Sequence, residues 1–309
     1  DKPAGMTSHD VVSRLRRYFH TKKVGHAGTL DPMATGVLVL GIERGTKFLA
    51  HMVASTKSYS ATIRLGASTT TDDAEGEFRW GKPAAALHRS AIEAEVAALT
   101  GDIMQKPAAV SAIKIKGKRA HELVREGKEV DIPARPVTIH SFDIHDLRTE
   151  GDFIDLDVSV ECSSGTYIRS LARDMGEALG VGGHLTALRR TTVGPFALAD
   201  AHLLADLAEN PRLSLSLDEA LKRSFPVLPV TEDELGFISQ LSLSEQDGTI
   251  SMSMPNPVVR PAIDMGTSPG GFGGTGGFGG GAGGFGDAFG DIFGDIFGGG
   301  RGGRGGGPQ

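Results

Sequence analysis

The chain of 309 residues has a single cysteine, Cys162, and no apolar run long enough to cross a membrane. One cysteine cannot form a disulfide within the chain or supply a cysteine cluster for a metal, which favours a reducing compartment. The N-terminus also lacks the charged and then apolar pattern of a signal peptide. We therefore expect a cytoplasmic protein with no membrane segment and no metal.

The chain also has fewer basic than acidic side chains, 32 against 38, which gives a formal net charge of −6. The deficit lies in residues 200–309, which hold 14 acidic and 6 basic side chains and leave residues 1–199 slightly positive. A basic region can bind phosphates, whereas an acidic one repels them. A nucleic-acid site is therefore expected only within residues 1–199.

The C-terminal region is poor in residues that build a core. Residues 266–309 hold 23 of the 44 glycines, with phenylalanines interspersed. Such a segment cannot bury enough apolar surface to offset its backbone entropy. We predict a folded domain over residues 1–225, a linker or poorly defined segment over 226–265 and a disordered low-complexity tail over 266–309.

Hydrophobic periodicity predicts helices and strands in mixed order over the first two thirds of the chain. Helical spacing runs from Ser8, the expected N-cap, to about His20, and again over about 168–179. Residues 59–65 alternate as a strand does, and two further alternating segments lie within 137–160. Strands separated by single helices, with hairpin-like pairs, indicate an α+β fold with a mixed, mostly antiparallel sheet and flanking helices.

The segment G-H-A-G-T-L-D-P-M-A-T-G, residues 25–36, presents one imidazole, His26, and one carboxylate, Asp31. Its glycines allow tight turns, and the proline after Asp31 keeps that residue out of the helical region. It is either a rigid loop that carries chemistry or a turn with a surface His and Asp. Arg169, at the start of a predicted helix, is a plausible partner, because a guanidinium keeps a carboxylate ionised and aims it. An ionised, desolvated aspartate is a competent nucleophile.

A second acidic stretch, Asp72, Asp73 and Glu75, raises the question of a metal site. Its spacing does not match a calcium-binding loop, and the required glycine is missing. We therefore expect it to be a solvated loop without a ligand.

Lysine and arginine are concentrated in residues 106–136. The pattern there combines a strand-like start, a turn at Gly117 and a short helix around His121. Cations clustered over adjoining elements favour binding to phosphates. This basic segment is a stronger candidate for nucleic-acid contact than the arginine-rich face of the first helix.

Four ordered motifs resemble the TruB family of tRNA pseudouridine synthases. They are D-K-P-A-G-M-T-S with the 25–36 segment, K-S-Y-S-A-T-I-R-L-G, the S-A-I-K segment from Ser111 to Arg119, and S-S-G-T-Y-I-R-S-L-A-R-D. The resemblance implies an isomerase that needs no metal or organic cofactor and converts the T-loop uridine of tRNA, position 55, to pseudouridine. It also implies a catalytic domain over 1–225 whose central mixed sheet carries the active-site cleft across its middle.

The resemblance also implies individual roles. Asp31 would be the nucleophile, attacking the base or the sugar of the uridine, and Arg169 would pair with it. Tyr59 would lie against the base and help with the closing proton transfer. His26 would contact the RNA where the flipped uridine leaves its stack, since a planar side chain can fill the gap. The remaining RNA-binding residues would be Tyr167 and Leu188 in the base pocket, Lys2, which mainly supports the catalytic loop, and Lys114, Lys118 and Arg119 in the tRNA-gripping insertion of about 106–136.

Alternatives remain beside this interpretation. One is a tRNA-binding or tRNA-folding protein without catalysis, and another is a protein whose tail drives self-association. Family members usually carry a strand before D-K-P and often a PUA-type domain at the C-terminal end, and no counterpart is recognisable after residue 225. The Gly/Phe tail instead resembles the linker of DnaJ-type co-chaperones. We expect tRNA, through its T-arm, as the partner of a monomeric enzyme.

Overall fold

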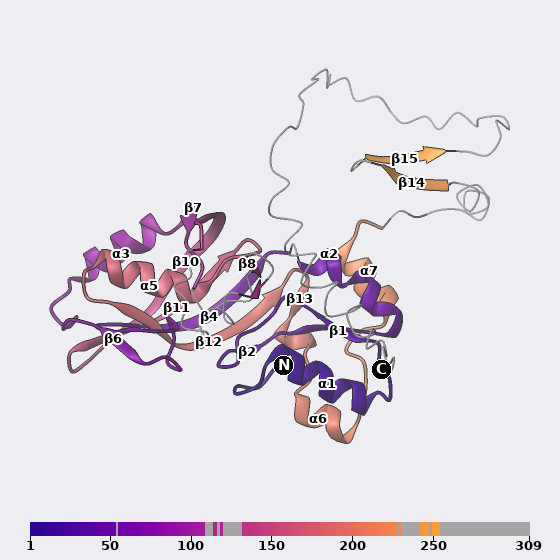
Figure 1. Ribbon diagram of the computed structural model, residues 1–309, viewed down its shortest axis with the longest axis horizontal. Coiled ribbons are helices and arrows are strands. Elements are labelled where there is room, and N and C mark those ends of the chain that lie inside the picture. Colours follow the sequence, from indigo (N-terminus) through magenta and orange to yellow (C-terminus); the bar gives the residue numbers. More distant parts are fainter. Residues whose placement is uncertain are drawn as a thin grey trace, which may run out of the picture. The chain divides into compact units, whose positions relative to one another are not determined.

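The computed structural model describes residues 1–53, 55–108, 132–227 and 229, and the backbone of residues 114–115, 118–119, 242–246 and 249–253 (Figure 1). The chain divides into two units, Asp1–Ser224 with Ala282–Gln309, and Phe225–Gly281. In the second unit the described secondary structure is one antiparallel hairpin, β14 (Ser242–Gln246) with β15 (Thr249–Ser253). The described residues include no helix long and apolar enough to span a membrane.

A seven-stranded sheet forms the centre of the first unit. Its order is β13-β12-β4-β11-β10-β7, and β2 pairs with β12 in parallel, whereas the other pairs are antiparallel. This confirms the predicted mixed, mostly antiparallel α+β fold. The strands are β2 (Thr35–Gly36), β4 (Lys57–Leu65), β7 (Gly101–Gln105), β10 (Arg135–Glu150), β11 (Phe153–Cys162), β12 (Gly183–Val193) and β13 (Phe196–Ala197).

Two helices, α3 (Arg89–Ala98) and α5 (Ile168–Ala178), pack together over one face of this sheet (Figure 1). Apolar residues at helical spacing in α5 and alternating residues of β4 join in one core, because each element buries a single face. That core includes Ile63 and Leu65 from β4 and Leu171 and Met175 from α5. Cys162 lies in it too, buried and unpaired, and burial raises the pKa of its thiol to about 11.

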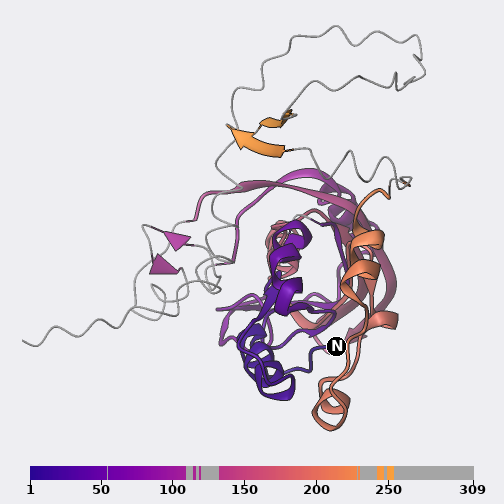
Figure 2. The same ribbon diagram turned by 90° about the vertical axis from the view of Figure 1, so that its right-hand side faces the viewer.

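A second core joins helix α1 (Ser8–Tyr18) to β1 (Val24–Ala27), which pairs with β3 (Val39–Ile42), and to helix α6 (Leu204–Glu209). Figure 2 marks the N-terminus between the indigo α1 and the salmon segment before α6. There the amino group of Asp1 donates to the carbonyl of His202 at 2.7 Å. The remaining elements are η1 (Glu43–Phe48), α2 (Leu49–Val53), β5 (Ser68–Thr69), β6 (Phe78–Trp80), β8 (Lys114–Ile115), β9 (Lys118–Arg119), η2 (Leu198–Asp200) and α7 (Leu217–Ser224).

The start of α1 differs from the prediction by one residue. Thr7, not Ser8, is the N-cap, and it forms a reciprocal capping box with Asp10. Ser8 is buried, and its hydroxyl accepts from the N–H of Leu30 at 2.9 Å and donates to its carbonyl at 3.2 Å. The sequence places two hydroxyl residues side by side, and only the tertiary contact with Leu30 decides which one caps.

Candidate active site

The loop that carries Asp31 runs from β1 to β2, and a buried arginine donates hydrogen bonds to its backbone. Arg190, on strand β12, donates to the carbonyls of Gly28, Thr29 and Val37 at 2.8–3.2 Å. Gly36 has a φ of +103°, and a Cβ there would lie 2.1 Å from the Arg190 carbonyl oxygen. Glycine is therefore required where the loop joins the sheet.

A buried lysine holds the same loop from the N-terminal side. Lys2 is 1% exposed, and its ammonium donates to the carbonyls of Pro3, Met6 and Pro32 at 2.7–3.1 Å. Burial lowers its pKa to about 8, an effect that the Asp31 and Glu75 carboxylates partly oppose. These contacts fasten Lys2 to the Asp31 loop and leave its side chain almost without exposed surface.

Asp31 and Arg169 lie together as the sequence predicts. Arg169 Nε is 2.9 Å from one Asp31 oxygen, and Nη2 donates to the other at 3.2 Å. The side chain of Arg169 is 5% exposed and that of Asp31 is 33% exposed. A two-pronged guanidinium contact fixes the direction of a carboxylate and favours its ionised form. The arrangement leaves one side of an oriented carboxylate open to a ligand.

A second carboxylate meets Arg169 from the opposite side. Asp73 lies 3.4 Å from Arg169 Nη1, which also donates to the Thr71 carbonyl at 2.8 Å. Both Asp73 and Asp72 are buried, and Asp72 pairs with Arg173 at 3.1 Å. Burial raises the pKa of Asp72, against the opposing effect of Arg173 and Arg169.

The expectation of a solvated acidic loop was therefore wrong. Asp72 and Asp73 pair with arginines that lie about a hundred positions later in the chain, and no local pattern in 69–76 reports such partners. The described residues contain no group of three or more His, Cys, Asp or Glu placed to hold a metal.

Tyr59 and Leu188 lie on the neighbouring strands β4 and β12 and share a hydrophobic core with Leu30 of the Asp31 loop. Tyr59, in β4, faces Arg190 of β12 in register, and Leu188 faces Ala61. Both side chains are less than 10% exposed and belong to the core that also contains Leu30 of the loop. Burial raises the pKa of the Tyr59 phenol, partly offset by the Arg190 guanidinium. The loop thus packs on strands β4 and β12.

Tyr167 is half-buried and is the residue from which helix α5 begins, two positions before Arg169. Its peptide N–H donates to the side-chain oxygen of Gln105 at 2.8 Å, and its carbonyl accepts from the Gln105 amide at 3.1 Å. Sequence reasoning missed Gln105, because a glutamine at a strand end has no pattern that distinguishes it from a surface residue.

The other predicted RNA-binding residues are only partly described. His26 lies in β1 opposite Leu40, half-buried, five positions before Asp31. Lys114, Lys118 and Arg119 lie on the β8–β9 hairpin, and their side chains are outside the described residues. The short helix expected around His121 is also outside them.

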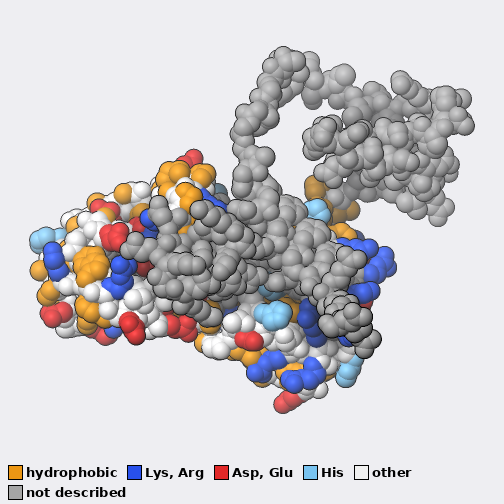
Figure 3. Space-filling view, in the orientation of Figure 1, with side chains coloured by type: hydrophobic (Ala, Val, Ile, Leu, Met, Phe, Trp, Pro, Cys, Tyr) orange, Lys and Arg blue, Asp and Glu red, His pale blue; other side chains and the backbone are white. Residues whose placement is uncertain are grey.

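Exposed cations gather on and after helix α1. Arg14, Arg17, Lys22 and Lys23 are exposed, and Figure 3 shows Lys and Arg side chains grouped where Figure 1 places α1. The opposite, apolar face of α1 is buried, so this charged face is the amphipathic complement of the core.

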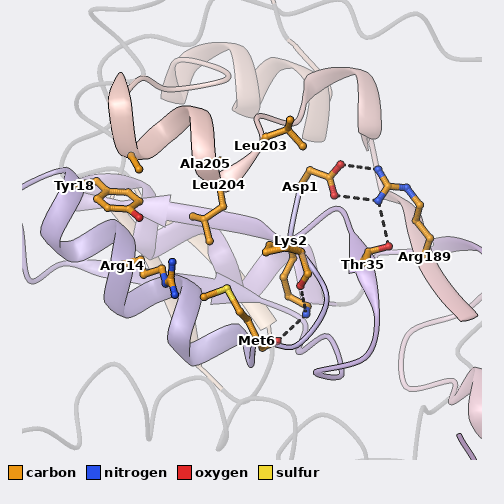
Figure 4. A pocket seen from close by; sticks show the side chains of 12 residues that line it. Asp1, Lys2, Met6, Arg14, Tyr18, Thr35, Arg189, Leu203, Leu204 and Ala205 are labelled. Carbon is orange, nitrogen blue, oxygen red and sulfur yellow. Dashed lines mark hydrogen bonds and ion pairs between the residues drawn. The ribbon is translucent and has the colours of Figure 1, made fainter. Parts of the chain in front are cut away.

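A cavity of about 420 Å³ lies beside the N-terminus, between α1 and α6 (Figure 4). Arg189 spans its edge, contacting the Asp1 carboxylate at 2.6 and 3.2 Å and the Thr35 hydroxyl at 3.2 Å. Its lining includes Lys2 but not Asp31, Tyr59 or Arg169. The cavity is therefore separate from the Asp31–Arg169 centre.

Comparisons with known proteins agree with the motifs. Residues 16–168 match the family described as "TruB family pseudouridylate synthase (N terminal domain)", and residues 169–227 match "tRNA pseudouridylate synthase B C-terminal domain". The chain is 77% identical over 234 residues to tRNA pseudouridine synthase B of Corynebacterium aurimucosum, covering 76% of this chain and 79% of the relative. It is 63% identical to the protein of that name from Mycobacterium avium, over 76% of each chain.

Solved structures share the fold. A chain in the "Crystal Structure of a Cbf5-Nop10-Gar1 Complex" superposes with a TM-score of 0.51 at 30% identity. The match covers 68% of this chain and 52% of that one, so this chain spans about half the length of that protein.

Proposed function

Because this chain belongs to the TruB family of pseudouridylate synthases, we propose that it isomerises the T-loop uridine of tRNA, position 55, with Asp31 as the nucleophile. The enzyme class follows from the family: an isomerase that makes pseudouridine in tRNA. The observation that carries the residue assignment is the Arg169 guanidinium on both oxygens of Asp31.

The reaction rearranges the uridine without adding or removing atoms. The bond from the ribose C1′ to N1 of uracil breaks, the detached base turns, and a bond from C1′ to C5 forms. C5 then releases its proton, and N1 carries a proton in the product. Asp31 attacks either the base or C1′, and its ionised carboxylate, held by Arg169, is the group able to do so.

The base is proposed to lie against Tyr59, with Leu188 and Tyr167 completing the pocket. Leu188 supplies an apolar wall, and Tyr59 a planar face close to the Asp31 loop. Since burial raises the pKa of Tyr59, its phenol keeps its proton near neutral pH. Its hydroxyl would therefore relay the proton that leaves C5 and not act as a phenolate.

The RNA is proposed to approach through its T-arm, gripped by the basic segment 106–136. A uridine inside a folded loop must be flipped out before its atoms can be attacked, and His26 is suited to fill the gap. Lys2 is assigned to the scaffold of the Asp31 loop, because its ammonium is occupied by three carbonyls.

A tRNA-binding protein without catalysis is the alternative. It has no chemical need for an oriented carboxylate beside a buried guanidinium, and holding charges out of water costs free energy. The Asp31–Arg169 pair therefore favours the enzyme.

The test uses a T-arm stem-loop RNA tritiated at C5 of its uridines, because product formation releases that hydrogen to water. We expect release with the full-length chain and none above background with Asp31→Asn. The matched control is Asp143→Asn, which removes an exposed carboxylate from β10 and should release tritium at the normal rate. Tight binding of the RNA without release from the unmodified chain would favour the non-catalytic alternative.

A further inference from the structure

Gln105 is a buried polar side chain that the proposed chemistry does not use. It is 2% exposed, and its amide oxygen and nitrogen both bond to the backbone of one residue, Tyr167. An amide can accept and donate at once, so the pair of bonds fixes both the position and the direction of the Tyr167 backbone. A buried residue with such a directional contact is suited to positioning.

The contact crosses from the edge of the sheet to the start of helix α5. Gln105 is the last residue of the edge strand β7 and pairs with Arg135, the first residue of β10. Tyr167 is the N-cap of α5 and has no side-chain cap of its own. Gln105 thus supplies, from another element, a restraint that the local sequence at the helix start lacks.

A second contact ties the next residue of the same junction to α5. Arg173, one turn beyond Arg169, donates to the Lys106 carbonyl at 2.6 Å. The same guanidinium is anchored by Asp72 at 3.1 Å and Asp174 at 2.7 Å. Consecutive residues 105 and 106, where the chain enters the basic segment 106–136, are therefore both fastened to the helix that carries Arg169.

We infer that Gln105 is a positioning residue: it holds the Tyr167 backbone, and with it the start of α5, so that Tyr167 and Arg169 face the base and Asp31. This inference rests on the proposed function, since it assigns Tyr167 to the base pocket. The hydrogen bond from Arg173 to the Lys106 carbonyl likewise fixes the first residue of the basic segment 106–136 relative to Asp31 and Arg169. Misplacement of a reacting group by about 1 Å can cost about 100-fold in rate.

The central variant is Gln105→Met, which keeps the length of the side chain and removes both hydrogen bonds. With enzyme in excess over tritiated T-arm RNA, we expect the single-turnover rate of release to fall about 10- to 100-fold. The dissociation constant for the RNA should stay unchanged, because Gln105 is buried and makes no contact with the solvent face. A second variant, Gln105→Glu, keeps an acceptor for the Tyr167 N–H and should lose less rate.

The control is Asp102→Ala on the same strand. It removes the 2.6 Å bond from the Thr138 hydroxyl to Asp102, an exposed contact near the other end of β7. The single-turnover rate of tritium release should then equal that of the unmodified chain. The inference would be overturned if both Gln105 variants released tritium at the normal single-turnover rate. It would also be overturned if their loss of activity came wholly from weaker RNA binding.

A measurement without turnover separates this inference from the proposed function. The chain has three tyrosines, Tyr18, Tyr59 and Tyr167. In protein labelled with 3-fluorotyrosine, Gln105→Met should shift the ¹⁹F resonance of Tyr167 and leave that of Tyr18 in place. A shifted Tyr167 in a chain that never releases tritium would keep the positioning role and reject the function; an unshifted Tyr167 would reject the positioning role.

Discussion

Two loops present a carboxylate to the same arginine, and they differ in what else they can meet. The first, between β1 and β2, brings Asp31 to Nε and Nη2 of Arg169. The second, between β5 and β6, brings Asp73 to Nη1 of the same guanidinium. The Asp31 side chain is 33% exposed, whereas that of Asp73 is 5% exposed.

The difference in exposure gives the Asp31 and Asp73 carboxylates different roles, although they are chemically identical. A carboxylate that is paired and still one-third exposed can attack a ligand, while one that is paired and enclosed can only orient its partner. The enclosed Asp73 and the Thr71 carbonyl hold the far edge of the guanidinium, so the near edge stays aimed at Asp31. The following variants test that division.

The largest effect is expected for Arg169→Met, because it removes the partner of both carboxylates. Breaking a buried ion pair from one side costs about 3–5 kcal/mol of unfolding free energy. We also expect tritium release to fall about 100- to 1,000-fold, since Asp31 loses the guanidinium that orients it. Urea unfolding and single-turnover release measure the two losses.

Arg169→Lys is the companion variant. It keeps the charge but loses the planar fork, so it should recover much of the stability and little of the rate. If Arg169→Lys recovers both equally, charge alone matters and the geometric argument fails.

The next effect is expected for Asp73→Asn. The new side chain keeps the shape of Asp73 and loses its charge. The single-turnover rate of tritium release should therefore fall about 10- to 100-fold, and RNA affinity should stay unchanged. Asp143→Asn is the control, because it makes the same change of charge at an exposed position on β10. A wild-type rate for Asp73→Asn would show that Arg169 needs no second carboxylate.

The two loops also mark how far sequence reasoning extends. The Asp31 loop is recognisable because its special backbone is written locally, in Gly25, Gly28, Gly36 and Pro32. Arg169 is a plausible partner from the sequence because it lies in the first turn of a predicted helix, two positions after Tyr167. The alternating segments likewise predicted β4, β10 and β11, since a half-buried strand has a period of two.

The enclosed side of the site was not predictable in the same way. Whether a carboxylate is solvated or buried depends on the arginine that meets it, and Asp73 meets one 96 positions later. Gln105 and Tyr167, 62 positions apart, present the same problem. Long-range pairing of polar groups leaves no periodic trace in a single sequence, whereas apolar packing does.

A smaller effect, on stability, is expected from the buried lysine beneath the Asp31 loop. The pKa of Lys2 is about 8 in the fold and 10.5 when unfolded, so between these values the unfolded chain binds more protons. The unfolding free energy should therefore rise by about 3 kcal/mol between pH 8 and pH 10.5, because the cost of keeping the buried ammonium charged is fully present below pH 8 and is gone above pH 10.5. Lys57, whose pKa burial also lowers to about 8, adds in the same direction.

Lys2→Met should flatten the Lys2 part of that rise and leave the Lys57 part. Chemical unfolding at pH 7.5, 9 and 10.5 measures the slope for each protein. An unchanged slope in Lys2→Met would mean that its ammonium stays charged throughout and that the three carbonyls outweigh its burial.

The smallest effects are expected from removing two neighbouring hydroxyls, because that of Ser8 supports the Asp31 loop whereas that of Thr7 caps helix α1. Ser8→Ala leaves the buried N–H of Leu30 without its 2.9 Å acceptor, and Thr7→Ala removes the cap of α1. Each should cost about 1 kcal/mol of unfolding free energy. Because Leu30 adjoins Asp31 and the cap is exposed, Ser8→Ala should also lower tritium release several-fold while Thr7→Ala leaves it unchanged. Equal release from the two variants would mean that the Asp31 loop keeps its shape through Lys2 and Arg190 alone.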